Sequence, residues 1–267
     1  MDTENIKTEN AKTEKVKIEE VMALVRETKQ FVENRDMAEH IRVKGPADYV
    51  TQVDTQIQGF LEEKLHSLAP GVEFLGEESG LHAMKGETFW ILDPIDGTTN
   101  LIHDYHHSTV SLALYDRGEI VMGIIYDPFR EEMFYAQKGE GSFLNGRPIH
   151  VSSAEGLKDT IVAIGTAPYQ KELAAENFQR FQRVFEKSQD IRRTGSAAMD
   201  LAYTACGRIG GYFEARLQPW DFAAGLLIVS EAGGRVTRFD GSLPDPVRPG
   251  ELLATNGRIH EELRSLL

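Results

Sequence analysis

The stretch from Trp90 to Asn100 carries the residues with the clearest capacity for chemistry. An apolar run of the kind found in buried strands is followed directly by Asp93 and Asp96, which Pro94 and Ile95 separate. Proline has a fixed backbone angle and stiffens the turn between the two carboxylates. Carboxylates this close repel one another, and a hard divalent cation such as Mg²⁺, which prefers oxygen ligands, removes that repulsion. The pattern predicts a metal site at the tip of a strand.

Gly97 and Thr98 follow the second aspartate directly. Glycine lets the backbone approach a ligand closely, and Thr98 stands where a helix can begin. The free N–H groups at a helix start favour an anion such as phosphate. We therefore expect metal and phosphate to meet at one turn. The alternative is an ordinary aspartate-rich turn in which Asp96 only caps the helix.

Composition predicts a globular protein without a membrane-spanning segment. The chain has 267 residues, of which 41% are hydrophobic, enough to build a sizeable core. It holds no run of about 18 apolar residues, and its first 20 residues are too polar for a secretory signal. Cys206 is the single cysteine, so an internal disulfide and a thiolate metal cluster are excluded. We expect a cytoplasmic protein in which Cys206 is a small packing residue.

The net charge of the chain limits the kinds of partner that it can bind. A net charge of −13 argues against broad affinity for nucleic acid or for an anionic membrane. It does not exclude a phosphorylated small molecule, because bound metal can reverse the local field inside an acidic cleft.

Hydrophobic periodicity and turn residues divide the chain into three parts. Residues 1–15 are polar and predict a disordered or loosely helical tail. Residues 16–151 predict an α+β lobe: an amphipathic helix from Val16 towards Ile41, then strands that alternate apolar and small residues in a β-meander. Residues 152–267 predict an α/β lobe, including a helix over 171–188. Its predicted buried stripe comprises Phe178, Phe181, Val184 and Phe185.

Other acidic residues stand at the ends of predicted elements. Glu77 and Glu78 follow a short strand, while Asp54 and Asp221 stand at helix starts. Each has an ordinary alternative: solvated surface for the glutamates and a helix N-cap for the aspartates. We interpret the histidines His103, His106 and His107 as surface or packing residues, because regular metal-ligand spacing is absent.

Three motifs in this order resemble the signature of the inositol monophosphatase family. They are Gly76-Glu77-Glu78-Ser79, the stretch from Asp93 to Asn100, and Trp220-Asp221-Phe222-Ala223-Ala224-Gly225, with further matches at 48–54 and 195–198. The family consists of Mg²⁺-dependent, lithium-sensitive phosphatases related to fructose-1,6-bisphosphatase. The resemblance implies an α/β fold with αβαβα layers, an active site between two lobes, and a homodimer. Periodicity alone gives only a mixed α/β protein.

The resemblance also implies a ligand set and a mechanism. One Mg²⁺ would be held by Glu77, Asp93 and the Ile95 carbonyl. A second would be held by Asp93, Asp96 and Asp221, and Glu77 would reach a third through water. Mn²⁺ accepts the same oxygen ligands. A metal-bound water would attack the phosphate monoester in line, positioned by Glu77 and by Thr98, which Asp54 orients. The N–H groups of Gly97 and Thr98 would hold phosphate oxygens, with Asp96 and Asp221 at the same substrate.

Substrate choice is left open by the sequence. Glu214 and the loop residues Gly195, Ser196 and Ala197 match positions that face a sugar alcohol in the family, which favours a small polyol phosphate. Lys44 and Arg193 could instead hold a second phosphate, as 3′-phosphoadenosine phosphate, NADP(H) or fructose 1,6-bisphosphate requires. An alternative of another class is a protein that binds a partner protein or RNA-associated machinery, with incidental phosphatase activity.

Overall fold

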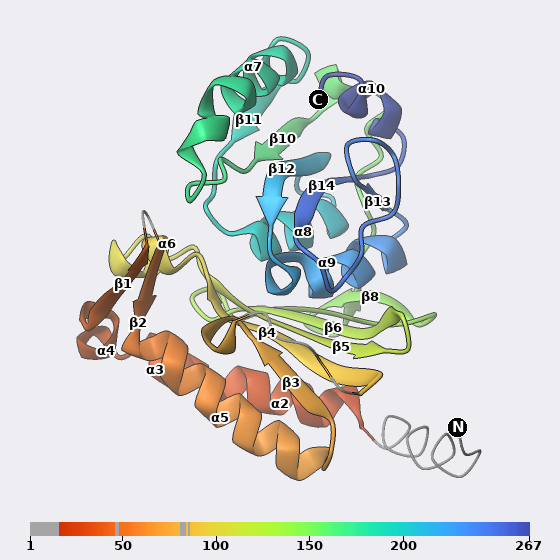
Figure 1. Cartoon of the computed structure of the whole chain (residues 1–267). Coiled ribbons are helices and arrows are strands. Elements are labelled where there is room, and N and C mark those ends of the chain that lie inside the picture. The colour runs from red at the N-terminus through yellow and green to blue at the C-terminus, as the bar shows by residue number, and fades with distance from the viewer. Residues whose placement is uncertain (1–15, 46–47, 81–83, 85) are drawn as a thin grey trace.

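The protein is built of five alternating layers (Figure 1). The computed structural model describes residues 16–45, 48–80, 84 and 86–267, so the predicted tail over residues 1–15 lies outside the described part. From bottom to top in Figure 1 the layers are α2 (Ile18–Glu27) with α5 (Gln52–Leu68), a seven-stranded sheet, α8 (Ala197–Ala205) with α9 (Pro219–Glu231), a five-stranded sheet, and α7 (Ala174–Phe185) with α10 (His260–Arg264). The predicted αβαβα layering is confirmed.

The larger sheet is an antiparallel meander with one parallel strand at its edge. In the described residues its order is β3 (Glu73–Gly76), β4 (Thr88–Asp96), β5 (Thr109–Asp116), β6 (Glu119–Asp127), β7 (Glu132–Gln137), β8 (Gly141–Leu144) and β9 (Arg147–Pro148), with β3 parallel to β4. Alternate residues of a strand face opposite sides. Leu112 of β5 accordingly packs in the core between the sheet and the helices α2 and α5, while the smaller Ala113 packs with α8 and α9.

Helix α9 lies unusually close to this sheet. A Cβ atom at Gly123 of β6 would lie 2.7 Å from the main-chain oxygen of Ala224, so only glycine fits there. The hydroxyl of Ser142 donates to the main-chain oxygen of Ile228 at 2.5 Å. These contacts hold α9, and with it the middle helical layer, against β6 and β8 of the sheet whose strand β4 carries the paired aspartates.

The smaller sheet belongs to the second half of the chain. Its order in the described residues is β11 (Asp190–Arg192), β10 (Ile161–Ile164), β12 (Gly211–Leu217), β14 (Gly250–Thr255) and β13 (Arg235–Thr237). Strand β10 is parallel to both of its neighbours, and β14 is antiparallel to β12 and β13. The first sheet ends at Pro148 and the second begins at Ile161, on either side of the boundary predicted at 151/152; the division into two lobes stays a prediction.

The predicted single helix from Val16 towards Ile41 is wrong. The segment contains α2, α3 (Lys29–Val32) and α4 (Arg35–Glu39), and β1 (Ile41–Gly45) pairs with β2 (Asp48–Thr51). The hydroxyl of Thr28 donates to the main-chain oxygen of Val25 at 2.6 Å where α2 ends. The Asn34 side chain then caps a new helix. Thr28 and Asn34 thus form hydrogen bonds with the backbone, and these bonds divide into separate helices a segment whose amphipathic pattern is continuous.

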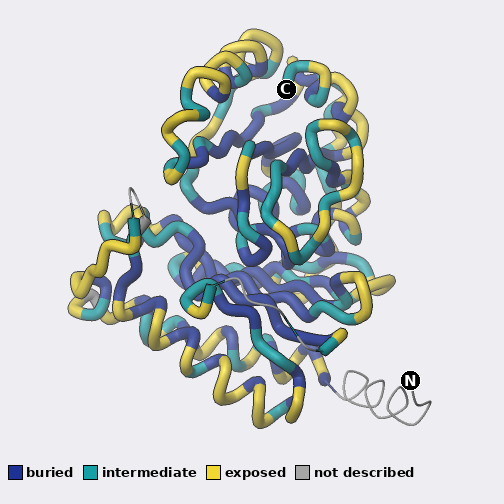
Figure 2. The backbone as a smooth tube through the Cα atoms, in the orientation of Figure 1, coloured by how far each residue is buried: buried dark blue, intermediate teal, exposed yellow. Residues whose placement is uncertain are grey.

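The predicted buried stripe of α7 is half right. Asn177, Phe181 and Val184 are buried, in the three- and four-residue spacing of one helix face. Phe178 is 67% exposed and Phe185 is 54% exposed, because each lies one position further round the helix. Figure 2 shows the outer side of this top layer as exposed. No helix in the described part of the chain is both long and apolar enough to cross a bilayer.

Candidate metal and phosphate site

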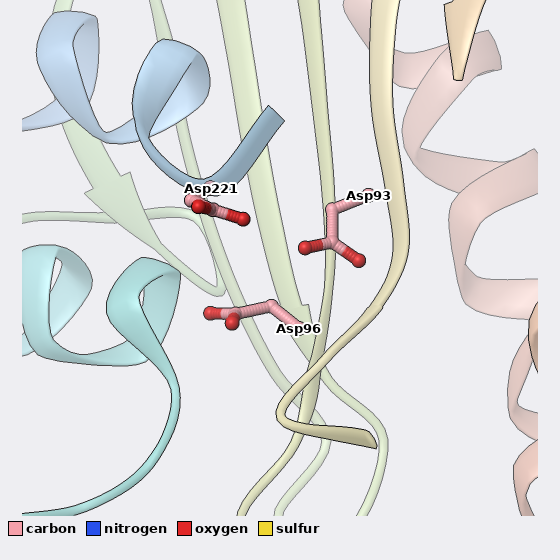
Figure 3. Close-up of side chains that lie close together, drawn as sticks. All are labelled: Asp93, Asp96 and Asp221. Atoms are coloured by element: carbon pink, nitrogen blue, oxygen red, sulfur yellow. The ribbon is translucent and has the colours of Figure 1, made fainter. Parts of the chain in front are cut away.

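Three aspartates from two distant parts of the chain converge below the start of α9 (Figure 3). Asp93 and Asp96 come from the end of β4, and Asp221 comes from the first turn of α9. One carboxylate oxygen from each lies within 4.8 Å of the others. Strand β4 continues through both of its aspartates, with an irregularity in its pairing with β5 between them. That irregularity lets two residues three positions apart serve the same cluster.

The electrostatics of this cluster suit a hard cation. Burial raises the pKa of Asp96 to about 6. The pKa of Asp93 is held well above its usual range, first by burial and then by the charges of Glu77, Asp96 and Asp221. The pKa of Asp221 is also held well above its usual range, first by burial and then by the charge of Asp96. Buried like charges of this kind are stabilised by a divalent ion with oxygen ligands, so the residues present fit Mg²⁺.

Glu77 lies beside this cluster, in a short 3₁₀ turn (Glu77–Ser79) that follows β3. Its carboxyl group lies close enough to Asp93 to raise the pKa of that aspartate, although it is outside the set of three aspartates. Its pKa is raised to about 7, chiefly by burial. The Lys44 ammonium of β1 lies 3.2 Å from Glu77 and 2.6 Å from Glu78. Lys44 thus contacts the two glutamates, and it is not among the residues that line the pocket described below.

Asp54 takes part in the start of α5 without being its N-cap, and it also contacts Thr98. The N-cap of α5 is Thr51, and Asp54 completes a capping box by accepting from the Thr51 main-chain N–H at 2.8 Å. Its other oxygen accepts from the Thr98 hydroxyl at 3.1 Å. Burial raises its pKa to about 6. Asp54 therefore connects a helix start to the threonine beside the paired aspartates.

Asp221 is not the N-cap that its position suggested. The N-cap of α9 is Gln218, Pro219 is the first helical residue, and Asp221 accepts from the Gln218 main-chain N–H at 2.6 Å. Asp221 thus completes the capping box of α9 and also contributes a carboxylate oxygen to the cluster with the two aspartates of β4.

Asp96 also holds the start of α8. It accepts from the Ser196 hydroxyl at 2.7 Å and from the Ala198 main-chain N–H at 2.6 Å. Gly97 has φ +94°, and a Cβ atom there would lie 3.1 Å from the main-chain oxygen of Gly195. Thr98 begins the short helix α6 (Thr98–Ile102), as the sequence predicted. The loop that precedes α8 is therefore pressed against the aspartate turn.

A pocket of about 880 Å³ opens beside the cluster, lined by Asp96, Asp221 and the turn 97–100, and also by Arg193, Ala197 and Glu214. Glu214 is buried and accepts from the Tyr212 hydroxyl at 2.6 Å and from the Ala167 main-chain N–H at 2.7 Å. The predicted substrate residues are brought together here. Ile95 is not among the lining residues, and its carbonyl accepts from the Thr98 hydroxyl at 3.0 Å.

The histidines predicted to be surface or packing residues have different surroundings. His106 bonds to Asp104 at 3.0 Å and stacks on Phe129, while His103 lines the pocket. Cys206 caps the end of α8 and packs against the central core.

Sequence reasoning assigned no role to Asn100 or Gln58, both of which the structure places at the site. Asn100 donates to two main-chain oxygens, one of them in the loop before α8. Gln58 contacts the turn that carries Glu77. Asn100 belongs to the motif itself, and Gln58 lies one helical turn after Asp54. These two positions are the features of the sequence that could have predicted a role for Asn100 and Gln58.

Comparison with known proteins agrees with this geometry. The model of the inositol monophosphatase family matches residues 4–267. An inositol-1-monophosphatase of Synechocystis is 41% identical over 86% of this chain and 80% of its own length. The Nus factor SuhB of Escherichia coli is 41% identical over 81% of both. The solved structure of the extragenic suppressor protein suhB from Bartonella henselae has a TM-score of 0.86 at 34% identity, covering 93% of this chain and 97% of that one. The chain therefore belongs to the inositol monophosphatase family of phosphate monoester hydrolases.

Proposed function

We propose that the protein hydrolyses small phosphate monoesters by direct attack of water, without a covalent enzyme intermediate. The convergence of Asp93, Asp96 and Asp221 beside the Gly97–Thr98 turn is the observation that carries this proposal. With Glu77 and the Ile95 carbonyl, these aspartates would hold two or three Mg²⁺ ions, and Mn²⁺ suits the same oxygens. When bound, the metal supplies positive charge to the phosphate and lowers the pKa of water.

The protein's own groups would position the water and move its proton. Glu77 lies beside the aspartates, and its carboxylate can accept the proton of the attacking water. The Thr98 hydroxyl is oriented by Asp54 and by the Ile95 carbonyl, and can orient the attacking water in turn. The main-chain N–H groups of Gly97 and Thr98 would hold phosphate oxygens.

A polyol phosphate such as inositol 1-phosphate is the substrate class that we favour. The buried Glu214 lines the pocket and can accept bonds from hydroxyl groups, with Gly195, Ser196 and Ala197 beside it. A nucleotide or bisphosphate is the alternative. It is supported by Arg193 and by three tyrosines, Tyr49, Tyr105 and Tyr169, that line the same pocket and could stack against a base.

Three further properties are proposed from family resemblance: inhibition by lithium, a homodimer, and a cytoplasmic location. Lithium would compete at the carboxylate cluster. We propose no role for nucleic acid or membrane, in keeping with the net charge of −13.

Partner binding is a second candidate function, because a relative that is 41% identical is named a Nus factor. In that case the catalytic residues would be retained while the protein acts chiefly through another protein. Substitution of Asp93 separates the two functions, since partner capture would survive the loss of phosphatase activity.

Phosphate release from inositol 1-phosphate, fructose 1,6-bisphosphate, 3′-phosphoadenosine 5′-phosphate and NADP tests the proposal. Each substrate is assayed with Mg²⁺, with EDTA, and with Mg²⁺ plus Li⁺. Metal-dependent release that Li⁺ inhibits is expected, and the order of kcat/KM chooses the substrate class. Release that is equally fast in EDTA would contradict the proposed metal site.

A further inference from the structure

Helix α5 presents a second buried polar side chain, Gln58, on the face that carries Asp54. The two residues are four positions apart, so their side chains lie on the same side of the helix, one turn from each other. Gln58 is only 8% exposed. A buried glutamine amide requires partners for its donor and its acceptor.

Both partners of Gln58 belong to the turn that carries Glu77. The Gln58 side-chain oxygen accepts from the Glu78 main-chain N–H at 3.0 Å. Its side-chain nitrogen donates to the Ser79 hydroxyl at 2.9 Å. One planar amide thus contacts two successive residues of a three-residue turn, immediately after the carboxylate whose orientation matters for the metal.

The residue before this turn is adapted to the same contact. A Cβ atom at Gly76 would lie 2.4 Å from the Gln58 side-chain oxygen and 2.6 Å from its amide carbon. Any side chain at this position would displace the Gln58 amide from the turn. The Gly76-Glu77-Glu78-Ser79 motif therefore contains both groups that bond to Gln58 and the glycine that makes room for it.

We propose that Gln58 is a positioning residue, which acts through the 77–79 turn to hold the Glu77 carboxylate towards Asp93. Helix α5 then orients two catalytic groups from one face: Asp54 orients the Thr98 hydroxyl, and Gln58 orients Glu77. The spacing between the two groups is set by one turn of a rigid helix. This inference rests on the proposed metal-dependent hydrolysis at the same site.

The test compares Gln58→Met, which fills the space without either hydrogen bond, with Gln58→Glu, whose carboxylate can accept from both the Glu78 N–H and the Ser79 hydroxyl. Gln56→Met is the matched control, because Gln56 is an exposed glutamine on the same helix. Mg²⁺ affinity is measured by calorimetry without substrate. Exchange of the Glu78 amide hydrogen is measured by NMR in metal-free protein, and kcat and KM are measured separately.

For Gln58→Met we expect faster exchange at Glu78, and Mg²⁺ affinity and kcat each lower by about tenfold, the loss typical of one well-placed hydrogen bond. KM should change by less than about twofold, because the phosphate is held elsewhere. Gln58→Glu should restore most of the affinity, and Gln56→Met should match wild type.

A folded Gln58→Met protein with wild-type Mg²⁺ affinity and kcat would overturn the proposal, as would a rise in KM with kcat unchanged. The affinity and exchange measurements need no substrate. They therefore decide the role of Gln58 even if every phosphate ester tested proves inert, which would count against the proposed function instead.

Discussion

The side-chain amide of Asn100 donates to the main-chain oxygen of Thr194 at 3.0 Å, and to that of His107 at 2.7 Å. Asn100 belongs to α6, directly after the aspartate turn, whereas Thr194 lies in the loop before α8. One amide therefore connects the segment that would bind metal to the loop that faces substrate. Together with the bonds from Asp96 to Ser196 and Ala198, it makes the two segments one unit.

Asn100→Leu keeps the approximate volume but removes both donated hydrogen bonds. The Thr194 carbonyl would lose a partner, and the loop over residues 193–196 should move away from the turn. We expect KM to rise about tenfold, with Mg²⁺ affinity changed by less than about threefold. Steady-state kinetics and metal calorimetry measure the two quantities; an unchanged KM would show that the loop is held without Asn100.

The metal turn could be predicted from sequence because its determinants are local. The strand ends in two aspartates around Pro94, and Gly97 and Thr98 follow directly. The chemistry can therefore be inferred from adjacent residues. The layered fold required the family resemblance, since periodicity gives only the element types. The roles of Gln58 and Asn100 were not predicted, because Gln58 bonds to a residue 20 positions away in the chain and Asn100 bonds to one 94 positions away.

Other errors in the sequence predictions have local causes. Thr28 and Asn34 divide the first helical pattern through bonds to the backbone. For Asp221 the N-cap was only the ordinary alternative, and the residue instead lies three positions into α9, where a capping box uses the same side-chain chemistry. Aromatic residues such as Phe178 fit a helical stripe by type, yet tertiary packing determines which face is covered.

Asp93→Asn should lower kcat by several orders of magnitude, because Asp93 would contribute to both of the proposed main metal positions. In metal-free protein the same change removes a buried charge that burial and three neighbouring carboxylates destabilise. We therefore expect the metal-free variant to melt no lower than wild type, while Mg²⁺ raises its Tm much less. Near wild-type turnover would contradict the assignment of Asp93, and a large drop in Tm would mean that the activity loss reflects unfolding.

Thr98→Val removes the hydroxyl that contacts Asp54 and the Ile95 carbonyl, while keeping the side-chain shape. A hydroxyl that orients the attacking water acts mainly on the chemical step, so kcat should fall by about 10²-fold, with KM nearly constant. Thr98→Ser retains the hydroxyl and should stay within about tenfold of wild type. Equal losses in the two variants would mean that the methyl group, not the hydroxyl, matters.

Mg²⁺ affinity should depend on pH between about 5.5 and 8. Burial raises the pKa of Asp96 to about 6 and that of Glu77 to about 7. The pKa values of these two groups are higher in the folded protein than in the unfolded chain. The groups therefore stabilise the metal-free fold at low pH, and this contribution is lost as pH rises through 6 to 7. Protons therefore compete with metal below pH 7. The Mg²⁺-induced rise in Tm should be larger at pH 8 than at pH 5.5, and equal rises would contradict this competition.

His260 should give stability the opposite dependence on pH. It is fully buried between the hydroxyls of Thr237 and Thr255, each 2.9 Å from a ring nitrogen. Burial, followed by the charge of Arg235, lowers its pKa to about 4 from an ordinary value of 6.5. The unfolded chain binds this proton more readily, so stability is retained above pH 6.5 and is lost as pH falls towards 4.

His260→Gln removes this dependence and leaves the carboxylate cluster in place. In EDTA, the Tm difference between wild type and the variant should be largest near pH 7.5 and should narrow towards pH 4.5, because only wild type has a buried imidazole to protonate. The carboxylates contribute equally to both proteins and cancel in the difference. A Tm difference that is constant across this range would show that His260 stabilises the fold through packing alone.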